Sequence, residues 1–147
     1  MTEPLRLERT FDASAEEVFD AWTNPLVLVR WWAAFPDWDS PGAEIDLRVG
    51  GRYRLQMHDP QTDEVVVVVG EYREIDRPRR LVYTWSYEGD EHESLVTVEF
   101  TQRGERTTVV LVHTGLPSEE SRRRHDEGWR GTFENLERRV LDDEHRH

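Results

Sequence analysis

The sequence predicts a protein of the α+β class, in which an antiparallel sheet and its helices occupy separate parts of the molecule. Three observations lead to this prediction: two short helical segments near the N-terminus, strand-like segments from residue 45 to 114, and a long amphipathic helix after them. The chain has 147 residues, which suits one domain, so we expect a single domain over residues 1–147 with its core at about 5–141.

A half-buried strand and a capped helix begin the fold. Residues 5–11 alternate between apolar and polar side chains, the period of a strand with one buried face. Ser14 and Glu17 have the spacing of a capping box, in which a hydroxyl and a carboxylate satisfy free N–H groups at a helix start. We therefore expect a short helix from this point to about Trp22.

A second short helix is expected to start at Asn24-Pro25, because proline is tolerated in the first helical turn. It ends in the adjacent pair Trp31 and Trp32. Neighbouring side chains on a helix point about 100° apart. We therefore expect one of the two rings to be buried under the sheet and the other to stand at a cavity entrance or an oligomer contact.

Six strands are expected between Ile45 and Thr114, because short apolar-rich runs alternate there with turn-forming residues, as in an antiparallel meander. A sheet of this size must curl, since each strand is twisted relative to its neighbours. The valine run at residues 65–69 leaves the inward face of its strand undecided. The turns are marked by Gly50-Gly51, Asp59-Pro60, Asp76-Arg77-Pro78, Gly89-Asp90 and Gly104-Glu105.

A long helix is expected from a cap at Ser118 to about Leu141. Its acidic first turn and basic last turn match the helix dipole. A mostly apolar stripe from His125 to Val140 recurs at helical spacing. We therefore expect this helix to lie in the concave side of the curled sheet.

The side chains expected to face inward are bulky and aromatic, and glycines interrupt them. Such a set can fill a core completely, or it can leave a cavity for a ligand, and both outcomes fit the residues. The candidates for lining a cavity between the sheet and the long helix are Trp32, Tyr53, Leu55, Met57, Tyr83, Trp85, Val98, Phe100, Leu111, His113, His125, Trp129 and Phe133.

His113 and His125 are the sharpest polar candidates, because both fall on otherwise apolar faces. They could orient a ligand or transfer a proton near neutral pH, or each could be a hydrogen-bonded structural histidine. A metal site would need a third ligand, which the sequence does not place. No nucleophile–base order, carboxylate pair or catalytic cysteine stands out, so we predict no catalytic residue, no metal and no cofactor.

The charge balance restricts the expected partners. Thirty-one acidic residues outnumber 19 basic ones, all of them arginine, which gives a formal net charge of -12. Such a surface repels nucleic acid and anionic membranes, so we expect neither as a partner. The acidity fits a salty habitat or GC-rich coding. No apolar run approaches the ~20 residues of a membrane helix and no signal-peptide core is present, so we expect a cytoplasmic protein.

Short motifs follow one another over roughly residues 5–141, among them Asn24-Pro25, Trp31-Trp32, Gly50–Arg54, Gly70–Ile75, Arg80–Trp85, Val96–Phe100, Thr107–His113 and Gly128-Trp129. In their order and spacing they resemble the SRPBCC (START-like) superfamily, in the branch named for the activator of the heat-shock-protein-90 ATPase. The resemblance implies the helix-grip fold, known from the birch pollen allergen. In that fold, a curved antiparallel sheet of six to seven strands wraps a long C-terminal helix, with two short helices after the first strand. It also implies a hydrophobic cavity, which the superfamily uses for apolar ligands.

Three functional hypotheses follow. The leading one is binding of an apolar small molecule in this cavity, without catalysis. The first alternative is an enzyme of the cyclase, dehydratase or hydrolase type that uses a cavity histidine as acid or base. The second is an interaction protein resembling a chaperone regulator, with an exposed apolar patch on the outer sheet face or near Trp31 and Trp38.

The expected partners follow from the same resemblance. The eukaryotic co-chaperone carries an additional N-terminal domain that contacts the chaperone, whereas this chain begins directly at the first strand. We therefore do not expect a chaperone partner. A homodimer is compatible with all three hypotheses.

Overall fold

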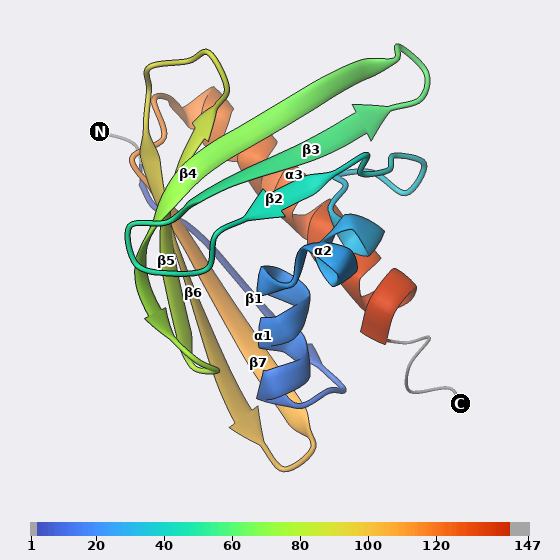
Figure 1. Cartoon of the computed structure of the whole chain (residues 1–147), viewed down its shortest axis with the longest axis vertical. Helices are drawn as coiled ribbons and strands as arrows, with labels where there is room; N and C mark the ends of the chain where they lie inside the picture. The colour runs from blue at the N-terminus through green and yellow to red at the C-terminus, as the bar shows by residue number, and fades with distance from the viewer. Residues whose placement is uncertain (1–2, 142–147) are drawn as a thin grey trace.

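The computed structural model describes residues 3–141, which form one curved antiparallel sheet and three α-helices (Figure 1). The sheet wraps the long helix α3 (Glu119–Leu136), while α1 (Ala15–Thr23) and α2 (Pro25–Trp31) follow the first strand. This arrangement confirms the predicted α+β helix-grip architecture. Residues 1–2 and 142–147 of the predicted domain lie outside the described residues.

The seven strands have the order β1-β7-β6-β5-β4-β3-β2, so β2 to β7 form a meander and β1 pairs with the last strand. In this closing pair, Leu5 lies opposite His113 and Phe11 opposite Thr107. The strands are β1 (Leu5–Phe11), β2 (Ala43–Ile45), β3 (Arg52–Asp59), β4 (Glu64–Asp76), β5 (Arg80–Tyr87), β6 (Ser94–Arg103) and β7 (Arg106–Thr114).

The helix starts are fixed by the side chains that the sequence indicated. The Glu17 N–H donates to Ser14 Oγ at 3.2 Å, and the Ser14 N–H donates to the Glu17 carboxylate, which completes the capping box. The Asn24 side chain caps α2 in the same way, and Ser118 caps α3. After Leu136 the helix widens into a π-helical turn, η1 (Glu137–Leu141).

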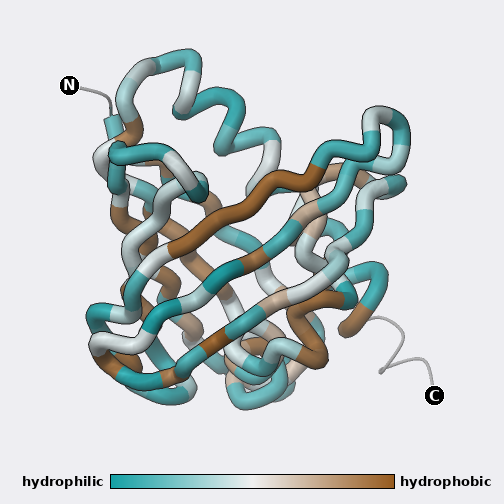
Figure 2. The backbone as a smooth tube through the Cα atoms, turned by 45° about the horizontal axis from the view of Figure 1, so that its top comes forward, coloured by the Kyte–Doolittle hydropathy of each residue, from teal (hydrophilic) through white to brown (hydrophobic). Residues whose placement is uncertain are grey.

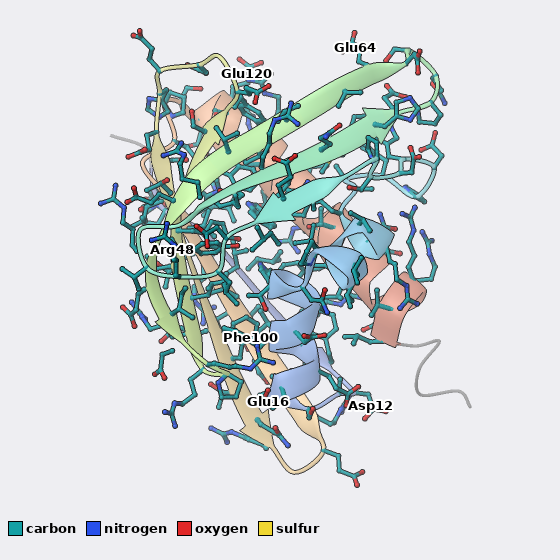
Figure 3. The ribbon with its side chains drawn as sticks, in the orientation of Figure 1. Asp12, Glu16, Arg48, Glu64, Phe100 and Glu120 are labelled. Atoms are coloured by element: carbon teal, nitrogen blue, oxygen red, sulfur yellow. The ribbon has the colours of Figure 1, made fainter. Side chains whose placement is uncertain are left out.

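The core lies between the concave face of the sheet and the three helices. Trp22 stands at its centre, with the rings of Trp31, Phe133 and Phe100 centred 5.0, 5.5 and 5.7 Å away. Figure 3 shows Phe100 between α1 and the sheet, while the labelled charged residues lie at the periphery. Such edge-to-face ring contacts add to the free energy gained from burial itself.

The valine run of β4 appears as a continuous hydrophobic band in Figure 2. Within it, Val66 and Val68 face the interior, whereas Val65 is 47% exposed. Further along the strand, the Tyr53 ring crosses over Gly70. A Cβ at Gly70 would lie 2.0 Å from the Thr84 carbonyl oxygen and 2.7 Å from the Tyr53 hydroxyl, so only glycine fits there.

Trp31 and Trp32 are both buried, with 0% and 2% of their surface exposed. The prediction that only one of the two rings would be buried is therefore wrong. The reason is that both directions are covered: Trp31 packs against Trp22 of α1, with ring centroids 5.0 Å apart, whereas Trp32 packs on another side against Trp85 and Trp129. The indole Nε1–H of Trp31 donates to the Ala21 carbonyl at 3.0 Å, so the polar group of this buried ring is satisfied.

Candidate functional site

A cavity of about 360 Å³, here called the chamber, lies between α3, strands β3–β5 and the loop that joins α2 to β2. Its wall is largely aromatic, because the loop and β5 face the helix with large rings. Phe35 and Tyr87 are both 38% exposed, so the chamber is open to solvent at this rim. The aromatic lining residues are Trp32, Phe35, Trp38, Trp85, Tyr87 and Trp129.

Five of the residues predicted to line a cavity do line the chamber: Trp32, Met57, Trp85, His125 and Trp129. Three of these rings enclose one end of it. The centroid of Trp129 lies 5.0 Å from that of Trp85 and 5.7 Å from that of Trp32, and Trp32 and Trp85 are 5.9 Å apart. This triangle of tryptophans offers flat apolar surfaces to a ligand.

The other candidates lie elsewhere, which corrects their predicted position. Tyr53, Leu55 and Tyr83 surround a void of about 10 Å³, which is barely the size of one water. Val98, Phe100, Leu111 and Phe133 are buried in the core and are not among the residues that line the chamber. The rings of α1 are the physical cause, because Phe19 and Trp22 pack against Phe100 at 5.3 and 5.7 Å and fill this half of the concave face.

His113 also lies behind the chamber wall and does not line it. It is therefore not placed to orient a ligand in the chamber, as the sequence had suggested. Its Nδ1 accepts a hydrogen bond from Trp129 Nε1 at 3.1 Å, so its Nε2–H donates to Ser94 Oγ at 2.7 Å. Burial, together with the nearby His125, lowers the pKa of His113 to about 3. His113 is therefore a neutral, hydrogen-bonded support that fixes the orientation of the Trp129 ring.

His125 reaches the chamber rim from α3. Its Nδ1–H donates to the Ser121 carbonyl at 2.8 Å, so Nε2 is the acceptor for the Tyr87 hydroxyl at 3.0 Å. Burial lowers the pKa of His125, which keeps the ring neutral at pH 7. Since both ring nitrogens of His113 and of His125 already have protein partners, the two histidines have no nitrogen left for a metal.

Two indole N–H groups of the chamber wall, Trp32 Nε1 and Trp85 Nε1, are buried without a hydrogen-bond partner among the described residues. A buried unsatisfied donor typically costs ~1–3 kcal/mol of stability, and native proteins keep few of them. The wall is therefore less stable than a fully satisfied core would be, and both open donors belong to rings that face the chamber.

The loop between α2 and β2 supplies lining residues that were not predicted: Ala34, Phe35 and Trp38. This loop is attached to the long helix by side chains of its C-terminal half. Asn135 Nδ2 donates to the carbonyls of Ala33 and Phe35 at 2.9 and 3.2 Å, and Arg139 donates to those of Pro36 and Trp38 at 2.7 and 3.0 Å. The aromatic residues on either side of Pro36 were the available signal, but only these long-range bonds bring them to the cavity.

The remaining lining residues come from faces that the sequence left open or that looked solvated. Val66 and Val68 line the chamber from β4, and Tyr87 lines it from the end of β5. Arg124, Glu127, Gly128 and Thr132 line it from α3. Gly128 was noticeable in the sequence as a small residue on an otherwise bulky stripe, and the chamber occupies the space that a side chain would fill there.

Within residues 3–141, no helix is both long and apolar enough to span a membrane.

Comparison with protein families gives one match: the model described as Activator of Hsp90 ATPase homolog 1-like protein fits residues 12–140. Comparison with curated proteins gives no match.

Many solved structures share the fold. A Chromobacterium violaceum protein superposes with a TM-score of 0.86 at 23% identity, covering 95% of this chain and 98% of that one. An AHSA1 protein from Silicibacter pomeroyi gives 0.82 at 25% identity, covering 96% and 99%. An HSP90 activator from Plasmodium falciparum gives 0.71 at 26% identity, covering 91% and 93%.

Proposed function

The chain belongs to the Activator of Hsp90 ATPase homolog 1-like family, and from this premise we propose that it binds an apolar, ring-bearing small molecule in the chamber. The observation that carries the proposal is the chamber itself. Its volume of about 360 Å³ falls within the range of small-molecule sites, roughly 300–1,000 Å³. A fully packed core would have no such space, and a void of this size costs stability unless something occupies it.

The wall supports a flat, apolar ligand. Trp32 stands edge to face with Trp85 and with Trp129, and the rings of Trp85 and Trp129 are tilted by 44°. Aromatic groups favour offset-stacked or edge-to-face contacts with such rings. Trp129 is held in place by its hydrogen bond to His113, so its ring is already oriented before a ligand arrives. A preorganised wall of this kind lowers the entropic cost of binding.

A thermal-shift screen against ring-bearing apolar compounds tests the proposal, with Gly128→Leu as the blocked variant. A side chain at Gly128 would meet only Ala34 Cβ, at 3.9 Å, so leucine extends into the chamber without a clash. A ligand at ~100 times its Kd stabilises the native state by about 2.7 kcal/mol. The unfolding midpoint of the parent should therefore rise by ~5–10 °C.

Gly128→Ala is the matched control, because it removes the same glycine but leaves most of the space empty. We expect ligand-induced shifts in the parent and in Gly128→Ala, and none in Gly128→Leu. Equal shifts in all three proteins would mean that the ligand binds elsewhere. No shift for the parent across a broad library would contradict the proposal.

Catalysis is the second candidate, because the Tyr87–His125 hydrogen bond lies at the chamber rim. A neutral histidine that accepts from a tyrosine hydroxyl is a suitable general base, and the tyrosine a suitable acid. Mass spectrometry of each binding compound after incubation with the parent and with His125→Gln separates the two roles. A new product with the parent alone would establish turnover, and unchanged compound with both would leave binding as the function.

No feature of the described residues favours a chaperone-regulating role in the way that the chamber favours ligand binding. The Plasmodium falciparum structure carries the name of an HSP90 activator, but that name belongs to that protein. The exposed large apolar residues of this chain lie on several separate elements, with Leu26 on α2, Val65 on β4 and Leu95 on β6. Scattered exposure of this kind is ordinary for a protein surface.

A further inference from the structure

A second space adjoins the chamber at the N-terminal end of α3. It measures about 480 Å³, is here called the antechamber, and has polar walls that include Asp90, His92, Ser118 and Ser121. The two spaces lie on either side of the same side chains, since both are lined by Val66, Trp85, Tyr87, Arg124 and His125. A ligand lying across this junction would place one end among aromatic rings and the other beside the hydroxyl, imidazole and carboxylate groups of the antechamber.

Arg124 is the charged residue that lines both spaces. Glu127 lines only the chamber and Asp90 only the antechamber. Other arginines of the same helix are engaged: Arg122 pairs with Glu119, and Arg130 with Asp126 at 2.6 Å. No carboxylate among the described residues pairs with Arg124, so its guanidinium has its hydrogen-bond donors available.

The charge of Arg124 acts at the junction itself. Burial raises the pKa of the Tyr87 hydroxyl, and the Arg124 charge opposes that rise. The same charge contributes to the lowered pKa of His125, after burial as the main cause. Both effects place a positive potential where the chamber meets the antechamber, in a protein whose net charge is -12.

We propose that the ligand carries an anionic head group, which Arg124 binds at the junction while the ring-bearing body fills the chamber. This rests on the proposed function, because it assigns the polar end of the same ligand. A guanidinium is well suited to carboxylate or sulfonate, since its fork of N–H donors matches two oxygens at once. The ligand class is thus an aromatic or alicyclic acid of small size, and not a neutral hydrocarbon.

Two fluorescent probes that differ by one anionic group test the inference. 1-Anilinonaphthalene-8-sulfonate carries a sulfonate, and N-phenyl-1-naphthylamine has the same ring system without it. Each is titrated into the parent, Arg124→Gln and Arg123→Gln, with probe emission excited through the chamber tryptophans as the readout. Arg123→Gln is the matched control, because it removes the same charge from an exposed neighbour that lines neither space.

We expect Arg124→Gln to weaken binding of the sulfonate about 5-fold or more and to leave the neutral probe unchanged. Arg123→Gln should change neither Kd by more than about 2-fold, because Arg123 is exposed like Arg124 but lines neither space. Added NaCl should weaken binding of the sulfonate to the parent and should have little effect on its binding to Arg124→Gln.

The failures of the two proposals are distinguishable. If both arginine variants weaken binding of the sulfonate equally, the proposal of an anionic head group is wrong, although the chamber still binds a ligand. The same conclusion follows if Arg124→Gln weakens binding of both probes equally. If neither probe binds the parent, or if both bind the parent and Gly128→Leu alike, the chamber is not the site and both proposals fall.

Discussion

His113 is a buried, neutral histidine of β7 that supports the Trp129 ring of the chamber wall. It lies on an apolar strand face, is 0% exposed, and forms hydrogen bonds through both ring nitrogens. Its centroid is 5.2 Å from that of His125, so protonating both would place two charges side by side in a buried setting. The pair therefore favours neutral rings.

This pair makes stability depend on pH. The pKa of His113 is about 3 in the folded protein and near 6.5 when unfolded, so between these values only the unfolded chain binds the proton. The free energy of unfolding should therefore fall as pH falls from about 6.5 towards 3, by up to ~1.4 kcal/mol per pH unit from this residue. Urea unfolding at pH 7, 6, 5 and 4.5 measures the slope.

His113→Gln identifies the source of that slope. The variant should be less stable than the parent at pH 7, because Trp129 and Ser94 lose well-placed partners, but its stability should change less between pH 6.5 and 4.5. His92→Gln, at an exposed histidine, is the control and should keep the parent's slope. An unchanged slope in His113→Gln would show that other groups govern the acid sensitivity.

At the scale of elements, the contact between α3 and the α2–β2 loop decides whether a chamber exists. Gly131 allows the closest approach, because a Cβ there would lie 1.8 Å from the Ala34 carbonyl oxygen. One turn earlier, a Cβ at Gly128 would make only an ordinary van der Waals contact with Ala34 Cβ, at 3.9 Å. The loop backbone is fixed by its bonds to Asn135, so it cannot easily move away. Two glycines on one helix thus have opposite roles.

Alanine substitutions should separate these roles. Gly128→Ala should stabilise the protein by ~0.5–1 kcal/mol, the usual gain from replacing a helical glycine. Gly131→Ala should destabilise it by ~1–3 kcal/mol, because the added methyl collides with backbone and the loop must shift. Chemical denaturation of both variants measures the difference, and equal effects would mean that the loop does not press on α3 as described.

At the scale of the whole molecule, charge is the dominant surface feature. Acidic residues outnumber arginines by 31 to 19, and the ion pairs described here lie mostly at exposed positions, such as Arg6 with Glu8 and Arg48 with Asp46. Exposed pairs contribute little each, typically ~0–1 kcal/mol, whereas the unpaired acidic excess repels itself across the surface.

Salt should therefore stabilise this protein. Raising NaCl from low concentration to ~0.5 M shortens the screening length well below 10 Å, which weakens the repulsion within the acidic excess. We expect the unfolding midpoint at pH 7 to rise by a few degrees and then level off. Differential scanning calorimetry over a NaCl series measures this, and a falling midpoint would mean that the exposed pairs outweigh the repulsion.

Much of the architecture followed from local pattern. The alternation of β1, the capping box at Ser14, the turns between strands and the apolar stripe of α3 each have a short-range physical cause. Trp31 and Trp32 were misjudged because partners distant in the chain cover both directions, Trp22 on one side and Trp129 on the other, which a helical period cannot anticipate. Val65–Val69 stayed undecided because valine suits both faces of a strand.

The sequence by itself determined the fold, the inward faces of the strands outside the valine-rich runs and the aromatic character of the interior, since these follow from periodicity, turn chemistry and family resemblance. Only the tertiary structure decided which inward residues meet empty space. Phe19 and Trp22 of α1 fill one half of the concave face, whereas the loop held by Asn135 stands off from α3 beside Gly128 and leaves the chamber. Whether a buried ring packs or lines a cavity depends on elements distant in the chain, and no local pattern carries that information.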